Sequence, residues 1–409
     1  MLESYRRVFS HPGSAAFSAS GLVARLPMSM MTLGIVILVS TLTGSYGLAG
    51  QVSAAFVIGN ALVAIPHGRI ADRFGQTRVL YVDAVLFALA TGLLVRAATD
   101  DWARPWPHLL AALSGAAMPQ VGSMVRARWA HVVRDDAERN TAFAVEAVVD
   151  EVVFVTGPGL VTFLSTLYAP QTGLLVALGL GTAGTFALAL QPRTAPPPHP
   201  VHETGAKDPM PWARLLPIAL AAIAMGSLFG ALEVATVAFA DDHGHKPVSG
   251  ALLAIFSAGS MLAGVVAGTV HWKVSDLRRF QAGIGLLAPA MLVLPFLDSL
   301  VLLGVVLFVI GTTLAPTLIA VVSLLEGSTP RSRLTEAMAV FQTGISAGLA
   351  PGAYLAGVVS DHAGGSRAYW VCGGSAALTL LAALSSRPAP QAAAPRTAAQ
   401  AEPGDPATD

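Results

Sequence analysis

The amino-acid sequence predicts an all-α polytopic membrane protein, with 12 transmembrane helices in two six-helix pseudo-repeat halves. Three observations carry this prediction. The 409 residues are 54% hydrophobic and 12% charged, whereas soluble domains carry about 25% charged residues. Long segments contain no charged residue, and the basic residues gather in alternate loops between these segments. An apolar content this high also excludes a chain that is mainly disordered.

Charge-free windows define the spans, because a helix needs roughly 20 apolar residues to cross a bilayer. Leu26–Gly68 is long enough for two spans with a turn at Thr43–Gly47, and Val152–Pro192 divides near Tyr168–Gly173. A proline after Arg25-Leu26 could break the start of the first span. We expect spans at 20–43, 49–67, 79–97, 107–125, 141–165, 172–190, 214–239, 249–270, 281–297, 301–325, 336–359 and 369–386.

The basic residues give the orientation. An even number of spans places both termini on one side, and 19 of the 24 basic residues then lie on that side. The other side carries only Arg96, Arg104, Lys246 and Arg367. Arg25 lies just inside the first span, from which its long side chain can reach the same surface. Basic loops stay in the cytoplasm, so we expect a multi-pass plasma-membrane protein with both termini cytoplasmic.

The loops divide the chain into four parts. We expect an N-terminal six-helix bundle over 1–190, a proline-rich cytoplasmic linker over 191–213, a C-terminal six-helix bundle over 214–386, and a disordered cytoplasmic tail over 387–409. The two bundles echo each other. Arg139–Val145 enters the fifth span in nearly the same residues as Arg333–Val340 enters the eleventh, as expected for a parallel internal repeat.

Composition and motifs also exclude several functions. Twenty-four basic residues balance 24 acidic ones, without a basic arm, so no nucleic-acid partner is expected. A single cysteine, Cys372, excludes a disulfide framework and a thiolate-rich metal site. No phosphate-binding glycine loop, intramembrane histidine pair or protease-type site is present in the sequence. We therefore expect neither an enzyme nor a metal or cofactor.

The segment between the second and third spans holds the most specific motif. Gly68-Arg69-Ile70-Ala71-Asp72-Arg73-Phe74-Gly75-Gln76-Thr77-Arg78 resembles the signature of the major facilitator superfamily, with Gln76 in place of a commoner basic residue. The alternative is a generic basic loop. The resemblance implies alternating access between the two halves, with Gly68, Asp72, Arg73, Gly75 and Arg78 forming a cytoplasmic gating motif.

Charges inside the predicted spans are candidates for proton coupling, because an unpaired charge in a bilayer is costly. Glu146 and Asp150 lie four residues apart and so share a helix face. Glu151 follows them, and Glu233 is the one acidic residue of the seventh span. The alternative for the fifth-span carboxylates is a structural salt bridge with basic partners, for which Arg25 and Arg126 are the candidates.

Other residues bear on the transport path. Gly157-Pro158 predicts a kink in the fifth span and loosely resembles the antiporter motif of drug exporters of the same superfamily. Asn60, Gln120 and Gln342 are candidate substrate contacts in a cavity that is otherwise apolar. Each of these residues could equally serve only in packing.

These features favour a bacterial secondary transporter that carries out proton-coupled efflux of a small organic compound, as an antiporter. Arginine outnumbers lysine by 21 to 3, a bias that resembles high-GC bacterial genomes. The expected partners are the small-molecule substrate, protons and the lipid bilayer, and we expect a monomer. The alternatives are a nutrient or metabolite importer or uniporter and, from another class, a non-transporting membrane sensor or scaffold.

Overall fold

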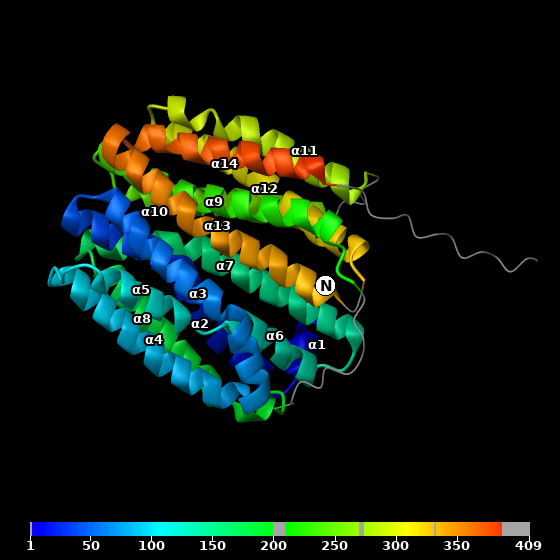
Figure 1. Cartoon of the computed structure of the whole chain (residues 1–409). Helices are drawn as coiled ribbons and strands as arrows, with labels where there is room; N and C mark the ends of the chain where they lie inside the picture. Colours follow the sequence, from blue (N-terminus) through cyan, green and yellow to red (C-terminus); the bar gives the residue numbers. More distant parts are fainter. Residues whose placement is uncertain (1, 199–208, 270–273, 331–332, 387–409) are drawn as a thin grey trace, which may run out of the picture.

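The computed structural model describes residues 2–198, 209–269, 274–330 and 333–386, and in these ranges the chain is helical with no strand (Figure 1). The predicted tail over 387–409 and residues 199–208 of the predicted linker lie outside the described residues. The first half consists of α1 (Leu2–Ser10), α2 (Ser14–Thr43), α3 (Tyr46–Phe74), α4 (Gln76–Thr99), α5 (Trp106–Ala116), α6 (Val121–Val132), α7 (Asp136–Leu167), α8 (Thr172–Ala189) and the short η1 (Pro192–Thr194).

The second half repeats this order. It consists of α9 (Trp212–Asp242), α10 (Val248–Thr269), α11 (Asp276–Met291), the short η2 (Leu294–Phe296), α12 (Leu300–Ser328), α13 (Leu334–Ala363) and α14 (Gly365–Ser385). Ten helices of the described chain are long and apolar enough to cross a membrane. The broken pair α5–α6 and helix α13 occupy the places of the fourth and eleventh predicted spans. The predicted fold class is therefore confirmed.

Two local predictions need correction, and one helix was not predicted. The fourth span is not one helix, because the chain leaves the helical path between Ala116 and Val121, where Pro119 lacks a backbone N–H. Pro27 does not break the first span, and α2 runs straight through it. Its ring packs against α8 at Gly181, where an added Cβ would lie 2.5 Å from the proline Cγ. The helix α1, before the first span, was not predicted.

The packing follows the internal repeat. Within the first half α2 packs on α7 and α8, α3 on α5, and α4 on α5 and α8. The corresponding helices of the second half form the same pairs, with α9 on α13 and α14, α10 on α12, and α11 on α12 and α14. Between the halves α3 packs on α13 and α7 on α10. These two contacts also correspond, because each joins the second helix of one half to the fifth of the other.

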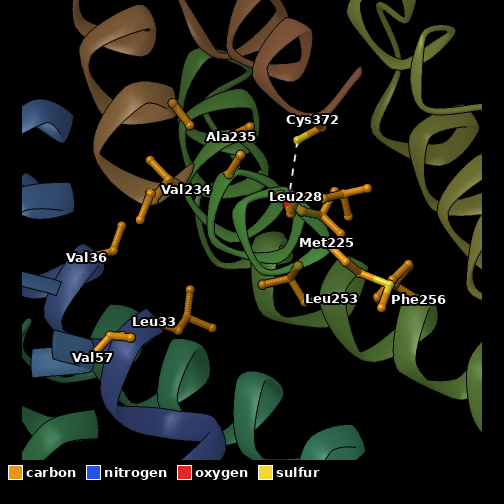
Figure 2. Packing of buried hydrophobic residues seen from close by; sticks show 14 of the residues in the cluster. Leu33, Val36, Val57, Met225, Leu228, Val234, Ala235, Leu253, Phe256 and Cys372 are labelled. Carbon is orange, nitrogen blue, oxygen red and sulfur yellow. Dashed lines mark hydrogen bonds between the residues drawn. The ribbon is translucent and has the colours of Figure 1, made fainter. Parts of the chain in front are cut away.

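The hydrophobic core shows where the halves meet. We call the end at which α2 begins and α14 stops the termini end, and the opposite end the far end. One buried cluster combines residues from the far-end parts of α2 and α3 with residues of α9 and α10. Figure 2 shows Leu33, Val36 and Val57 of the first half beside second-half members of the same cluster. A second cluster, around Trp129, lies at the termini end within the first half alone. The halves therefore share a core at the far end.

Candidate functional site

A carboxylate closes the far end between the two halves. Asp361, in the last turn of α13, accepts hydrogen bonds from Ser45 Oγ at 2.8 Å and from the backbone N–H groups of Tyr46 and Gly47 at 2.6 and 2.7 Å. These donors form the N-terminus of α3, where Ser45 also caps the helix by accepting from Leu48 N. A negative charge is favoured at a helix N-terminus, so Asp361 joins α13 of one half to α3 of the other.

A second set of polar contacts lies beside it. Tyr46 donates its hydroxyl to Asp241 at 2.6 Å. Lys246, in the loop between α9 and α10, donates to Ser40 Oγ of α2 at 3.1 Å and to Asp241 at 3.3 Å. Burial lowers the pKa of the Lys246 ammonium, and the charge of Asp241 partly opposes this shift. The far end is thus joined by side chains from α2, α3, α9 and α13.

Small residues bring the backbones of the halves together at the same end. A Cβ added to Gly50 of α3 would overlap the carbonyl of Ala353 on α13, and one added to Gly357 would overlap the carbonyl of Tyr46. Gly250 of α10 lies equally close to the carbonyl of Pro158 on α7. Close approach of this kind is typical of glycine-lined contacts between membrane helices.

The signature segment, Gly68–Arg78, lies at the termini end, and its charged side chains do not join the two halves by ion pairs within the described chain. Gly75, with φ of +88°, makes the whole turn between α3 and α4. Gly68 lies inside α3, so the predicted loop is much shorter than expected. Asp72, Arg73 and Arg78 are exposed, and none of them forms an ion pair with another described residue. Arg73 lies over the ring of its neighbour Phe74, at 5.3 Å.

Two of the predicted carboxylates belong to a buried network in the first half. Glu146 of α7 is fully buried and accepts from Ser18 Oγ at 2.9 Å and from Trp129 Nε1 at 2.7 Å. Its other oxygen pairs with Arg25 of α2. The same guanidinium also pairs with Asp150 at 2.9 Å, as expected for two carboxylates four residues apart on one helix face.

Asp150 completes the network toward the surface. Its second oxygen pairs with Arg126 of α6 at 2.7 Å. Two guanidinium groups therefore balance two carboxylates, and exposure rises from 2% for the Arg25 side chain to 38% for Arg126. Both basic residues named as candidate partners lie in the network. Ser18 and Trp129 were missed, because neither carries a charge that marks it in the sequence.

The other two candidate carboxylates lie outside this network. Glu151 is half-buried and, within the described chain, has no ion-pair partner. Glu233 lies in the middle of α9, and Thr32 of α2 lies near its carboxyl group. Its Oε1 is buried and has no hydrogen-bond partner among the described residues. Glu233 thus faces the other half of the molecule with one oxygen unsatisfied.

The Gly157-Pro158 pair lies where three helices meet. The α7 helix is continuous through it. A Cβ on Gly157 would overlap Ser29 of α2, whose hydroxyl donates to the carbonyl of Val153 at 2.8 Å. Pro158 contacts α10 at Gly250. The pair therefore packs α7 against both α2 of its own half and α10 of the other half, and the kink stays a prediction.

The three cavity candidates are not brought together. Asn60 of α3 donates to the carbonyl of Gly115 at 3.1 Å, so it holds α5 within the first half. Gln120 is the residue before α6 and is half-buried. Gln342 of α13 is exposed. A separate cavity of about 280 Å³ lies at the far end inside the first half, with Val39, Val52, Asp101, Arg104 and His108 among its lining residues.

Comparison of the sequence with known protein families shows to which family the chain belongs. The sequence model described as Major Facilitator Superfamily matches residues 17–325 and 282–408. The chain belongs to the Major Facilitator Superfamily. Members of this superfamily are membrane transporters, so the predicted transporter fold is confirmed. No curated protein sequence matches the chain.

Solved structures of the superfamily show the same fold. The structure of "the POT family transporter PepTSo" superposes with a TM-score of 0.73 at 14% identity, covering 91% of this chain and 96% of that one. That of "nucleoside transporter NupG" gives 0.71 at 14% identity, covering 91% and 98%. The "human organic anion transporter MFSD10 (TETRAN)" gives 0.64 at 17% identity, covering 91% and 99%. At these identities the likeness concerns the fold alone.

Proposed function

We propose that this superfamily member is a proton-coupled exporter that moves a small, amphipathic organic compound out of a bacterial cell. It works by alternating access as a monomer in the plasma membrane, with the termini end facing the cytoplasm. The bundles over 1–190 and 214–386 act as the two moving units, joined by the linker over 191–213.

The observation that carries the proposal is the contrast between the two ends. At the far end the halves share a hydrophobic core, and Asp361 of one half caps α3 of the other. At the termini end the first half has its own core, and the exposed charges of the signature make no ion pair within the described chain. With the termini in the cytoplasm, this is the inward-facing state, ready to take substrate from inside.

Glu233 is the residue we assign to proton coupling. A carboxyl group with a buried, unsatisfied oxygen is costly when ionised and less so when protonated. Its contact with Thr32 crosses from one half to the other, so rocking of the halves changes its surroundings. A proton and the substrate compete for the same carboxylate, so the binding of one requires the release of the other, which is the requirement for antiport. The neutral network around Arg25 serves instead to hold α2, α6 and α7 together.

Two features support efflux of an amphipathic compound. The candidate polar contacts are few and scattered, whereas a sugar needs many hydrogen-bond partners. Gly157-Pro158, the core of the exporter motif, lies at the contact between the halves. The signature motif at Gly68, Asp72, Arg73, Gly75 and Arg78 is free in this state, as needed for a latch that engages only when the cytoplasmic end closes.

The test uses purified protein in liposomes that enclose a pH-sensitive dye. A lipophilic cation is added with and without an imposed proton gradient, and the wild type is compared with Glu233→Gln, with Glu151→Gln as the matched control on α7. We expect cation-dependent proton movement that only Glu233→Gln abolishes. Substrate movement that ignores the gradient would instead establish a uniporter. Binding without any movement would favour a sensor, and gradient-driven accumulation in the opposite direction an importer.

A further inference from the structure

A histidine and an aspartate form a buried pair within the signature hairpin. His67 of α3 and Asp83 of α4 are 5% and 6% exposed, and His67 Nε2 lies 2.8 Å from Asp83 Oδ2. Each residue is eight positions from Gly75, the turn that joins the two helices. At 1.5 Å of rise per residue the pair lies about 12 Å below the turn, so it links α3 and α4 inside the bundle.

No other charge reaches the pair within the described chain. On its own helices Arg69, Asp72, Arg73 and Arg78 are exposed at the surface, and Tyr81 packs on Phe186. Of the helices packed on α3 and α4, α8 has no titratable residue. The described titratable groups of the others lie elsewhere or have partners. On α2 and α5 these are Arg25, in the buried network, and His108, at the start of α5. On α9 and α13 they are Arg214, Glu233, Asp241, Asp242, Tyr354, Asp361 and His362.

Helix α6 approaches the beginning of α4 with two further cations, and both have partners. Arg128 donates to Gln76 at 3.0 Å, to the Gln191 carbonyl and to Thr194. Arg126 pairs with Asp150. His131 of α6 is exposed. The charge of the His67–Asp83 pair is therefore set by the two side chains themselves.

Each of the two protonation states of the His67–Asp83 pair leaves one unfavourable feature, either a buried net charge or a buried N–H group without a partner. With a neutral imidazole that donates from Nε2 to an ionised Asp83, the pair carries one net negative charge in a buried site, which is costly. With an added proton the charges cancel, but Nδ1 then carries an N–H group. Nδ1 is buried and has no hydrogen-bond partner among the described residues, and an unpaired buried donor is also costly. The two costs oppose each other, so neither state is favoured by both terms.

We propose that His67 and Asp83 form a proton-binding site inside the first half, separate from Glu233 and from the Arg25 network. The ligand is one proton, bound at Nδ1 of the imidazole while Nε2 keeps its hydrogen bond to the carboxylate. Because the pair joins the two helices that carry the gating motif, proton binding acts on the hairpin that forms the latch. The site concerns proton binding only, so it stands whether or not the protein exports its substrate.

The test follows the protonation of the imidazole directly. Full-length protein labelled with ¹⁵N-histidine is placed in liposomes, and its nitrogen spectrum is recorded between about pH 5 and 9. The signal absent from His67→Gln belongs to His67. We expect this signal to convert from imidazolium to neutral imidazole within the range, the ratio of the forms changing about tenfold per pH unit. In Asp83→Asn, which removes the counter-charge, it should stay neutral throughout.

Two controls keep the result decisive. Asp72→Asn removes an exposed acid from the same hairpin and should leave the His67 signal unchanged. His131→Gln removes the signal of an exposed histidine, which should not be the signal assigned to His67. Should His67→Gln fail to fold, the infrared carboxyl bands lost in Asp83→Asn report on the same pair in the wild type. A pair whose imidazole and carboxyl signals both keep one form across the whole pH range would be a fixed structural contact, and the proposal would be overturned.

Discussion

The carboxylates of α7 and the carboxylate of α9 lie in opposite environments. Glu146 and Asp150 are each held by guanidinium groups, and every oxygen of this pair has a partner. Glu233 faces the other half with one unsatisfied oxygen. A carboxylate that is fully paired with guanidinium groups stabilises the packing of its helices, and it stays ionised because the neighbouring positive charge disfavours the protonated form. A carboxyl group without a cation is the better carrier of a proton, and for this reason we propose a structural role for the α7 pair and proton coupling for Glu233 of α9.

The largest effect should come from removing Arg25, the buried cation of the network. Arg25→Gln leaves the fully buried Glu146 without a cation, while Asp150 keeps only Arg126. Breaking a buried pair in this way costs about 3–5 kcal/mol, so we expect a large loss of unfolding free energy in detergent. Arg126→Gln, at the exposed edge, should cost much less. The double variant Arg25→Gln/Glu146→Gln should recover part of the loss; a single variant as stable as the wild type would contradict the structural role.

The second prediction tests the other side of the comparison. Glu233→Gln removes a charge that has no cation, so the loss of unfolding free energy should be far smaller than the loss expected for Arg25→Gln. Gradient-driven transport should nevertheless fall about 100-fold, or about 2.7 kcal/mol, while exchange of substrate without a gradient continues. Flux measurements in liposomes and thermal unfolding of the same preparation separate the two effects. Equal losses of stability in Glu233→Gln and Arg25→Gln would abolish the distinction between the two regions.

A third, smaller effect concerns the far end. Asp361→Asn keeps the shape of the side chain but removes the negative charge from the N-terminus of α3. We expect the closed far end to lose about 1–2 kcal/mol, a shift of roughly 5- to 30-fold toward an open far end. Distances between spin labels on α3 and α13 measure this shift. Asp298→Asn, an exposed acid at the same end, should leave the distances unchanged.

The smallest effect should be a pH dependence of the same closure. Burial of Lys246 lowers its pKa from the ordinary 10.5, so the closed form binds fewer protons than a form in which this side chain lies in water. Raising the pH through the window between the lowered pKa and 10.5 therefore favours closure. The change should be less than about fivefold. Lys246→Gln should remove it and Arg104→Gln should not; a closure weakened by alkaline pH would contradict the sign.

Much of the fold could be read from hydropathy and charge. The predicted spans at 172–190, 214–239 and 301–325 agree with α8, α9 and α12 to within a few residues, because a long uncharged segment has few alternatives to a membrane helix. The prediction was wrong in the fourth span and at Pro27. The local sequence was similar in both places, because Pro119 and Pro27 each lie within an apolar segment. Whether the helix continued depended on neighbours such as Gly181, which lie far away in the sequence.

The candidate site was predicted less completely. The charged members of the α7 network were all named from the sequence, since a charge in a span is conspicuous. Their pairing was open, because Arg25 and Glu146 are separated by 121 positions. Asp361, which joins the halves, was missed because it lies at the end of a predicted span, where an acidic residue is ordinary. Asn60 looked like a cavity residue until its contact with Gly115 placed it between α3 and α5.

The sequence by itself determined that this is an α-helical membrane protein and where most of its spans lie. Composition, charge-free windows and the sorting of basic residues are sums over many positions, and no single contact can reverse them. Only the tertiary structure decided which charges are paired, which end is closed, and that His67 lies against Asp83. The physical reason is that the free energy of a buried charge depends on a partner a few ångströms away, and the helix that supplies this partner is fixed by packing rather than by any local pattern.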